Sequence, residues 1–257
     1  MDHSRRFGGI GRLYGHAALA RFTQAHLCVV GVGGVGSWAV EALARSAIGR
    51  LTLVDADHLV ESNINRQLPA LGPTLGRAKI EVLAERIEQI NPHAKVSLVD
   101  DFLDQANLMA LMGAGFDYVI DCIDQFRIKA ALIHHCRRHR IPLVVTGAAG
   151  GQVDPQRIRV SDLSRTEQDP LLARTRRLLR QEFGFSRNPK RRFQVAAVWS
   201  DEPVLAPLGE RLCESRGGGG LNCGGYGACT PVTASFGMAA AAYVLRQLAG
   251  EAHGKKA

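Results

Sequence analysis

The sequence contains no pair of cysteines at CxxC spacing and no strongly apolar run long enough to cross a membrane. Its six cysteines are scattered at positions 28, 122, 136, 213, 223 and 229, and three of them lie in or beside apolar segments. This distribution is typical of reduced thiols in the cytosol and does not suggest a disulfide framework. Because paired cysteines are missing, we expect no structural zinc site.

Two further regions bear on where the protein resides. The N-terminal MDHSRRFGG carries charge with no apolar run behind it, which fits neither a secretory signal nor a lipidation motif. The uncharged run from Gly217 to Leu245 is Gly-rich and then only weakly apolar. It predicts a buried helix, since a membrane span needs about 20 strongly apolar residues. We therefore expect a cytoplasmic protein with no stable membrane insertion.

Strand-like and helix-like segments alternate through the first half of the 257 residues. Apolar runs at 27–31, 51–54, 96–99, 117–120 and 142–145 predict strands, and amphipathic patterns at 35–47, 76–90 and 125–139 predict helices. After Gly147 the pattern becomes shorter and turn-rich, which favours antiparallel strands. We expect an α/β fold: a Rossmann-like, doubly wound, mainly parallel sheet extended by antiparallel strands.

The rest of the second half predicts four more segments. These are a basic helix at 171–183, a strand at 193–200, a Gly-rich loop at 214–230 and a closing helix at 231–249. The basic segment at 171–192 holds seven Arg and one Lys against a single Glu182, so it carries +7 of the net charge of +8.

A glycine-rich turn, LCVVGVGGVG at 27–36, lies directly after a strand and opens a helix. Gly31, Gly33 and Gly36 fit GxGxxG, and Gly34 lies in the same turn. The first glycine permits the turn, and the second lets backbone amides approach a phosphate. The helix N-terminus adds roughly half a positive charge. The motif predicts a bound nucleotide.

Asp55 and Asp57 end the next strand, at the place where a carboxylate accepts ribose hydroxyls. For either acid alone, a solvated strand end is the simpler interpretation. The turn and the two acids are equally compatible with NAD, FAD, ATP and S-adenosylmethionine.

Two cations favour ATP among these ligands. A pyrophosphate carries about two negative charges and can be held by backbone amides, whereas ATP carries about four and usually needs cations or a metal. Arg66 follows the second strand and Lys79 starts the next helix, so both should lie over the carboxyl edge of the sheet. The amide side chains that surround Arg66 could bond phosphate oxygens or fix the guanidinium; they are Asn63, Asn65 and Gln67.

Two acids in DYVIDCID, Asp121 and Asp124, should reach the same edge. An acid there can hold Mg²⁺ on phosphates. Asp124 would also serve as the N-cap of the helix that begins at Gln125. Mg²⁺ binding and helix capping both stay open, and each of the two acids could serve one of these roles.

Five ordered motifs, GVGGVG, DAD, SNINRQ, GRAKIE and DCID, resemble the ubiquitin-activating-enzyme-like adenylating superfamily (ThiF/MoeB/HesA). RFGGIGRLYG at 6–15 and the ending NCGGYGACTPVTASFGMAAA are similar to its tRNA threonylcarbamoyladenosine dehydratase branch. The resemblance covers nearly the whole chain.

The resemblance implies an ATP-dependent ligase or dehydratase. A carboxylate attacks the α-phosphate of MgATP, and the threonyl carboxylate of the modified adenosine at position 37 of tRNA is the group activated. The ureido part of the same modification then closes a ring, with net loss of water. By motif match Arg66 and Lys79 neutralise charge, Asp124 holds Mg²⁺, and Asp55 or Asp57 holds the ribose.

The same resemblance suggests how the chain is organised. We expect one adenylating domain over 1–257, with a nucleotide-binding half at 1–150, a substrate and dimer half at 151–249 and a flexible tail at 250–257. It also gives the basic segment a use, because its cations could track tRNA phosphates; they are Arg174, Arg176, Arg177, Arg180, Arg187, Lys190, Arg191 and Arg192. A solvated helix face without a partner is the alternative.

Some family features are uncertain in this sequence. Relatives insert an N-terminal Arg into the ATP site of the partner subunit of a homodimer, and Arg12 is the candidate here, although its Gly-rich surroundings differ. The resemblance also offers Cys223 as a thioester-forming residue, as in some members, but no adjacent His activates it and an intramolecular cyclisation does not need it. A sulfur-transfer or carrier protein partner is possible.

Three other functions use parts of the same pattern. Adenylation of the C-terminal carboxylate of a small ubiquitin-like sulfur carrier needs a groove for a Gly-Gly tail and no basic surface. An NAD-dependent oxidoreductase would share GxGxxG and Asp55 but leave Arg66, Lys79 and Asp124 without a common task. A noncatalytic RNA-binding or scaffold protein would leave the whole nucleotide site vestigial.

Overall fold

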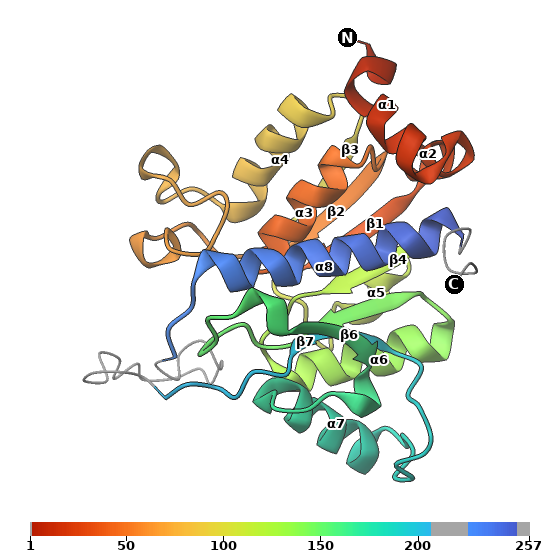
Figure 1. The fold of residues 1–257 in the computed structure, drawn as a ribbon, viewed down its shortest axis with the longest axis vertical. Helices are drawn as coiled ribbons and strands as arrows, with labels where there is room; N and C mark the ends of the chain where they lie inside the picture. The colour runs from red at the N-terminus through yellow and green to blue at the C-terminus, as the bar shows by residue number, and fades with distance from the viewer. Residues whose placement is uncertain (1, 207–225, 251–257) are drawn as a thin grey trace.

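The computed structural model describes residues 2–206 and 226–250. A seven-stranded sheet in the order β3-β2-β1-β4-β5-β7-β6 lies at its centre (Figure 1). The strands are β1 (His26–Val30), β2 (Arg50–Val54), β3 (Lys95–Val99), β4 (Tyr118–Asp121), β5 (Leu143–Thr146), β6 (Ile158–Asp162) and β7 (Ala196–Ser200). All neighbouring pairs are parallel except β6 and β7, which are antiparallel. The predicted doubly wound sheet with an antiparallel extension is therefore confirmed.

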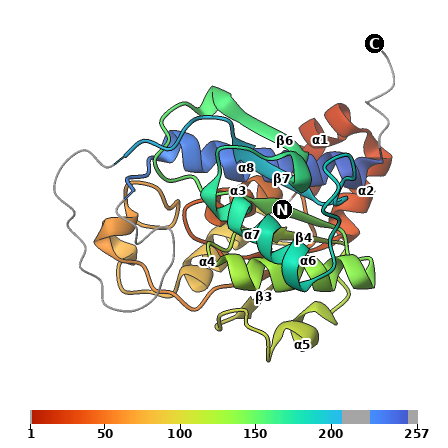
Figure 2. The same ribbon diagram turned by 90° about the horizontal axis from the view of Figure 1, so that it is seen from below.

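Helices cover both faces of this sheet. They are α1 (His3–Tyr14), α2 (His16–Gln24), α3 (Gly36–Arg45), α4 (Lys79–Ile90), α5 (Leu108–Met112), α6 (Phe126–His139), α7 (Pro170–Glu182) and α8 (Thr230–Ala249). Buried residues of α2, α3, α4 and α8 form one core with the sheet, and those of α5, α6 and α7 form a second. Figure 2 shows α8 and α6 on opposite sides of the strands.

The strand sequences explain why the sheet has two covered faces. In β1, Leu27 and Val29 belong to the core under α3 and α8, whereas Cys28 and Val30 belong to the core under α6. Successive side chains of a strand point to opposite faces, so a strand that is buried on both sides reads as a continuous apolar run. This is the pattern that predicted the five parallel strands of the first half.

The predicted helices form within a few residues of their expected positions. The helix α4 ends at Ile90, with Asn91 as its C-cap, because Pro92 cannot continue a helix. The closing helix is confirmed as α8, and among the helices of the described residues none combines the length and the apolar character that a membrane crossing requires. The predicted Gly-rich loop at 214–230 lies outside the described residues apart from 226–230, and so does the predicted tail apart from Gly250.

The sequence did not predict α1 and α2. Glycine disfavours helix interiors, and α1 contains three of them. The helix begins because the Asp2 side chain accepts the amides of Ser4 and Arg5. Gly11 is buried, and a Cβ there would lie 3.2 Å from Leu19 of α2. The glycine that weakens the helix pattern thus lets α1 pack closely on α2.

Candidate nucleotide-binding site

A cavity of roughly 340 Å³ opens where the parallel strands end. Its walls come from the segments that follow β1, β2, β3, β4 and β5, together with residues beside the start of α8. Ligands of open α/β sheets bind outside the carboxyl ends of the strands, at the place where strand order reverses. Here that place lies between β1 and β4, from which the chain winds outward in both directions.

Most of the predicted site residues line this cavity. They are Gly31, Gly33, Gly34, Asp55, Asp57, Asn63, Arg66, Gln67, Lys79 and Asp124. Gly36, Asn65 and Arg12 do not line it. The fold therefore brings into one cavity residues that the sequence spreads over nearly a hundred positions.

The glycine turn is held in a conformation that only glycine fits well. Gly31 has a φ of 81°, in the left-handed region. A Cβ on Gly36 would lie 1.8 Å from the Gly31 carbonyl oxygen, so this glycine acts by packing and not by facing the cavity. No side chain caps the N-terminus of α3. Its first amides can therefore serve an anion, as the motif predicts.

The two strand-end acids have different environments. Asp55 is buried, and its Oδ2 and Oδ1 accept the amides of Val32 at 2.8 Å and Asp57 at 3.0 Å. Burial raises the pKa of Asp55, although Lys79 and the two amides oppose this shift. The Asp57 side chain is half exposed. Asp55 thus braces the glycine turn from below, and Asp57 leaves oxygen surface open to a ligand.

Lys79 lies between these acids as the first residue of α4. Its Nζ is 2.6 Å from Asp57 Oδ2 and 3.9 Å from Asp55 Oδ1, and its side chain is buried. The helix α4, which starts beside β2, thus delivers a desolvated cation to the cavity, where water screens its charge only weakly.

Arg66 provides the second cation. Its Nη1 donates to the Ser62 carbonyl at 2.6 Å and to Asn65 Oδ1 at 3.0 Å, and its carbonyl accepts the Trp38 indole. Partial burial lowers the pKa of Arg66, which nevertheless stays far above neutrality. The guanidinium is therefore preorganised by its own loop.

The amide side chains around Arg66 divide into two groups. Asn65 lies outside the cavity, where it holds Arg66 and donates from Nδ2 to the Ala228 carbonyl at 2.8 Å. Asn63 accepts the Val60 amide. Gln67 lines the cavity and is buried, and its Oε1 has no hydrogen-bond partner among the described residues. Gln67 thus keeps an unpaired acceptor inside the cavity wall.

The acids after β4 also separate. Asp121 is completely buried in an ion pair with Lys129 and cannot reach a ligand. Asp124 lines the cavity, and α6 begins at Phe126 with Gln125 as its N-cap, so the alternative of Asp124 as N-cap is wrong. No cluster of three metal-binding side chains occurs among the described residues. One carboxylate beside phosphates nevertheless fits Mg²⁺, which needs few protein ligands.

A buried ion pair lies behind the cavity wall that follows β4, and neither of its residues lines the cavity. Lys129 Nζ on α6 is 2.8 Å from Asp121 Oδ1, and both side chains are fully buried. Asp121 Oδ1 also accepts the amide of Ile123, which lines the cavity. On the adjacent loop, Asp169 Oδ2 accepts the Ala148 amide at 3.0 Å. Buried charges thus fix the backbone of the two loops that follow β4 and β5.

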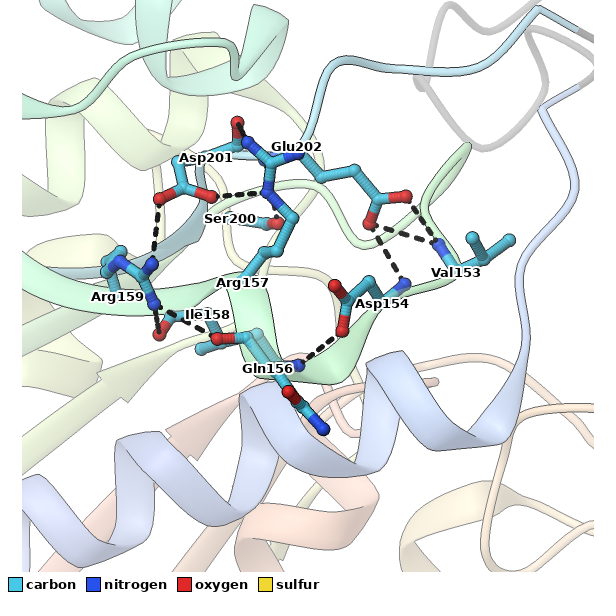
Figure 3. Close-up of polar contacts among 9 residues, drawn as sticks. All are labelled: Val153, Asp154, Gln156, Arg157, Ile158, Arg159, Ser200, Asp201 and Glu202. Carbon is cyan, nitrogen blue, oxygen red and sulfur yellow. Dashed lines mark hydrogen bonds and ion pairs between the residues drawn. The ribbon is translucent and has the colours of Figure 1, made fainter.

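Figure 3 shows the polar contacts that anchor the turn before β6 to the end of β7. The Glu202 carboxylate accepts the amides of Val153 at 3.1 Å and of Asp154 at 3.0 Å. Beside it, Arg157 and Arg159 both pair with Asp201. These contacts fix the turn before β6 against the end of β7. The cavity wall from Thr146 to Gly150 leads directly into this anchored segment.

Sequence analysis missed an apolar wall of the cavity. Asp101, Phe102 and Leu103 follow β3, and they face the same space as Ile123 and Ile128. Leu103 is buried, whereas Phe102 is 57% exposed. These residues could have been found from the sequence, because they directly follow a predicted parallel strand. The rule that ligands bind at the carboxyl ends of such strands had already located Asp57 and Asp124.

None of the described cavity thiols is activated. Burial raises the pKa of Cys122 to about 12, so this cavity-lining residue is a thiol at neutral pH. Cys229 lies near the cavity entrance with its Sγ 3.7 Å from the Gln152 carbonyl. Cys223 lies outside the described residues, and its role stays a prediction.

The remaining predicted residues lie on the surface. Arg12 is an exposed residue of α1, so any role in a partner's site stays a prediction. In the basic segment, Arg176 donates to Thr166 and Arg180 lies over the Phe193 ring, 5.3 Å from its centroid. The other six cations are exposed: Arg174, Arg177, Arg187, Lys190, Arg191 and Arg192.

A Rossmann-like sheet with a glycine turn, one buried cation, one partly buried cation and a carboxylate around one cavity defines a nucleotide-binding protein. Residues 7–257 match the ThiF family, and the chain belongs to that family. It is 50% identical over 248 residues to the tRNA threonylcarbamoyladenosine dehydratase of Haemophilus influenzae, covering 96% of this chain and 94% of the relative.

Solved structures agree with this assignment. The crystal structure of E. coli tRNA N6-threonylcarbamoyladenosine dehydratase in complex with ATP matches with a TM-score of 0.88 at 48% identity, covering 98% of this chain and 97% of that chain. The complex of the same enzyme with AMP matches with a TM-score of 0.87 at 49% identity, covering 97% and 96%. The resemblance seen in the sequence motifs therefore extends over the whole fold.

Proposed function

We propose that this chain is an ATP-dependent enzyme that dehydrates N6-threonylcarbamoyladenosine at position 37 of tRNA. The threonyl carboxylate is adenylated, and the same modification then closes into a ring. The observation that carries the proposal is the convergence of Arg66, Lys79 and Asp124 on the glycine turn. The near full-length similarity to dehydratases, one of them solved with ATP, supports it.

The first step joins two anions, and the two cations lower its barrier. The carboxylate oxygen attacks the α-phosphorus of ATP, the bond to the bridging oxygen breaks, and pyrophosphate leaves. Charge develops on the phosphate oxygens as this happens, and fixed cations in a water-poor cavity stabilise it. Lys79 is buried and Arg66 is held by its own loop, so neither needs large reorganisation.

Asp124 would hold Mg²⁺ against the phosphates of ATP. Bound there, the metal would neutralise part of the phosphate charge and orient the leaving group. Asp57, which lines the cavity, would accept the ribose hydroxyls, and Asp55 holds the glycine turn through the Val32 amide. The apolar wall at Leu103 and Ile128 offers a surface for the adenine base.

The second step needs no external nucleophile. The ureido group of the activated modification attacks the acyl carbon, AMP leaves, and a ring forms with net loss of water. Because nucleophile and electrophile belong to one molecule, the effective molarity is high. A cysteine thioester is unnecessary, and the described cavity thiol Cys122 is protonated at neutral pH.

The partners of this enzyme follow from the same proposal. The exposed cations of the basic segment would contact tRNA phosphates. A homodimer would place Arg12 of one subunit at the ATP site of the other. A sulfur-transfer or carrier protein partner and the cytoplasmic location stay predictions.

The alternatives from the sequence receive less support. Adenylation of a sulfur-carrier protein uses the same cavity but not the basic segment. Relatives of that class cover less of this chain: E. coli molybdopterin-synthase adenylyltransferase is 38% identical over 49% of it. An NAD-dependent oxidoreductase would give Arg66 and Lys79 no common role, and a noncatalytic RNA-binding protein would have no need to preserve them.

The test is incubation of the purified protein with MgATP and tRNA that carries the threonylcarbamoyl modification, followed by mass spectrometry of the nucleosides. We expect the modified adenosine to lose one water only when ATP is present. An unmodified tRNA is the control. An unchanged nucleoside mass, with protein shown to bind ATP, would contradict the proposal.

A further inference from the structure

The sequence from 125 to 153 contains no acidic residue. It holds four Arg, one Lys and three His, and it includes the whole of α6. Lys129 is neutralised by Asp121 inside the protein. At the C-terminal end of α6, however, Arg137, Arg138 and Arg140 are all exposed. The net charge outside the basic segment is close to zero, but the positive charges there include a second cluster at the end of α6.

Both helices that carry this charge start at the cavity. The residues just before α6, Asp124 and Gln125, line it, and so does Leu171 in the first turn of α7. The N-cap of α7, Asp169, holds the Ala148 amide of the cavity wall. A helix of 14 residues is about 21 Å long, so the end of α6 lies roughly that far from the cavity.

The end of α6 is continuous with the basic segment. Arg137 Nη2 donates to Gln194 Oε1 at 2.8 Å, and the His134 ring lies 4.9 Å from the Phe183 ring. These contacts join α6 to the start and the end of the loop that carries Arg187 and its neighbours. Figure 2 shows α6 and α7 together on one side of the sheet. The two clusters therefore form one surface.

The exposed cations of this surface have no acidic partners. No salt bridge among the described residues includes any of the exposed arginines at the end of α6 or in the basic segment. By contrast, five arginines elsewhere in the described residues form salt bridges; they are Arg45, Arg77, Arg86, Arg157 and Arg159. A row of unpaired cations destabilises a surface through mutual repulsion, so its persistence favours a polyanionic partner.

We propose that the C-terminal end of α6, Arg137 to Arg140, and the basic segment form one RNA-binding surface for the phosphate backbone of the stem next to the modified base. This inference rests on the proposed function, because that function requires the base to enter the cavity. Cations that continue for about 20 Å beyond the cavity match the repeating charge of a nucleic acid stem. The end of α6 holds the part of the stem farthest from the base.

The test variant combines Arg138→Gln with Arg140→Asn. Asparagine suits the left-handed backbone of Arg140, whose φ is 59°. Arg137 is retained because it bonds Gln194. The matched control is Arg50→Gln with Lys95→Gln, which removes the same charge from exposed positions on β2 and β3 near the other edge of the sheet.

Binding of tRNA is measured over a range of salt concentrations, and turnover is measured with modified tRNA. For the α6 variant we expect the slope of log affinity against log salt to become shallower by about 1.5, since two phosphate contacts are lost. KM for tRNA should rise, while kcat and KM for ATP stay unchanged. The control should match the wild type in all four quantities.

Three outcomes would overturn the inference. The first is an α6 variant that matches the control. The second is equal loss of binding to tRNA and to polyglutamate, which would indicate an acidic protein as the partner. The third is a wild-type protein that does not bind tRNA. The wild type could bind tRNA, with a shallower salt slope in the α6 variant, and yet show no turnover. That result would support the RNA-binding surface and contradict only the proposed function.

Discussion

Lys129 and Asp121 form an ion pair in which neither side chain is exposed to solvent. The second carboxylate oxygen of Asp121 has no hydrogen-bond partner among the described residues, and burial raises the pKa of this acid against the opposing effect of Lys129. Removing one partner of such a pair leaves a buried charge without compensation. The loop after β4, which Asp121 holds through the Ile123 amide, is therefore sensitive to substitution of either residue.

Replacement of Lys129 by Met should lower the free energy of unfolding by about 3–5 kcal/mol. The combined replacement with Asp121→Asn should recover much of this loss, because both buried charges are then absent. Chemical denaturation of the wild type and the two variants measures the difference. A Lys129→Met protein as stable as the wild type would show that the pair does not hold these loops.

The pH dependence of stability should report on Glu41, which receives hydrogen bonds from Arg45 and Arg86 at 2.6–2.9 Å. Burial opposes ionisation of this acid, but the two arginines outweigh it and lower its pKa. A lowered folded-state pKa stabilises the protein above the unfolded-state value of about 4.3, and the stabilisation is lost as pH falls through the folded-state pKa. Wild type should therefore exceed Glu41→Gln in stability at pH 7 by about 1 kcal/mol, allowing for the partial exposure of the arginines.

Urea denaturation of both proteins at neutral pH and near pH 3 tests this sign. The difference between them should shrink at the lower pH. A difference that grows under acid conditions would contradict the assignment.

Phe102 should contribute to ATP binding through its position on the apolar wall. Base stacking on an aromatic ring is worth about 1–3 kcal/mol, so Phe102→Ala should raise KM for ATP roughly tenfold with little change in kcat. Leu98→Ala removes a comparably exposed apolar side chain from β3, outside the cavity, and is the matched control. Equal KM values for the two variants would place the adenine elsewhere.

Arg66→Ala, Lys79→Ala and Asp124→Ala should each abolish measurable turnover while leaving the fold intact. The loss of one group that stabilises transition-state charge typically costs about 10²–10³ in kcat. Arg77→Ala is the control, because Arg77 lies just before α4 but outside the cavity, where it pairs with Glu85. Turnover is followed as pyrophosphate release and the fold as the thermal unfolding midpoint. Full activity in any of the three variants would refute the role of that residue.

Removal of divalent metal should stop the reaction as well. Chelation by EDTA should abolish adenylation, and added Mg²⁺ should restore it in the wild type but only at higher concentration in Asp124→Asn. Turnover measured against Mg²⁺ concentration provides the check. Equal metal requirements in both proteins would exclude Asp124 as a ligand.

The features that could be predicted from sequence are those that a single physical rule governs. Apolar runs marked the strands β1 to β5, and parallel strands bring their carboxyl ends to one edge, so these strands and the convergence of Arg66, Lys79 and Asp124 on one cavity could be predicted. The helix α1 was missed because Gly11 weakens the helix pattern, and its packing on α2 becomes visible only in three dimensions.

Burial of charge could not be predicted either. Lys129 shares the helix face of Leu132, Ile133 and Cys136, so its position is compatible with burial, but helical spacing does not identify the acid that neutralises its charge. Only the contact with Asp121 shows that it is internal. The same limitation hid the connection between the end of α6 and the basic segment, which depends on the contact of Arg137 with Gln194, 57 residues away.

The fate of one oxygen atom tests the central claim, adenylation of the threonyl carboxylate, most directly. The carboxylate of the modified tRNA is labelled with a heavy oxygen isotope, and the nucleotide products are analysed by mass spectrometry after a single turnover with ATP. Attack on the α-phosphorus followed by ring closure predicts one labelled oxygen in AMP and none in pyrophosphate. Unlabelled AMP, or label in inorganic phosphate together with ADP, would contradict the account.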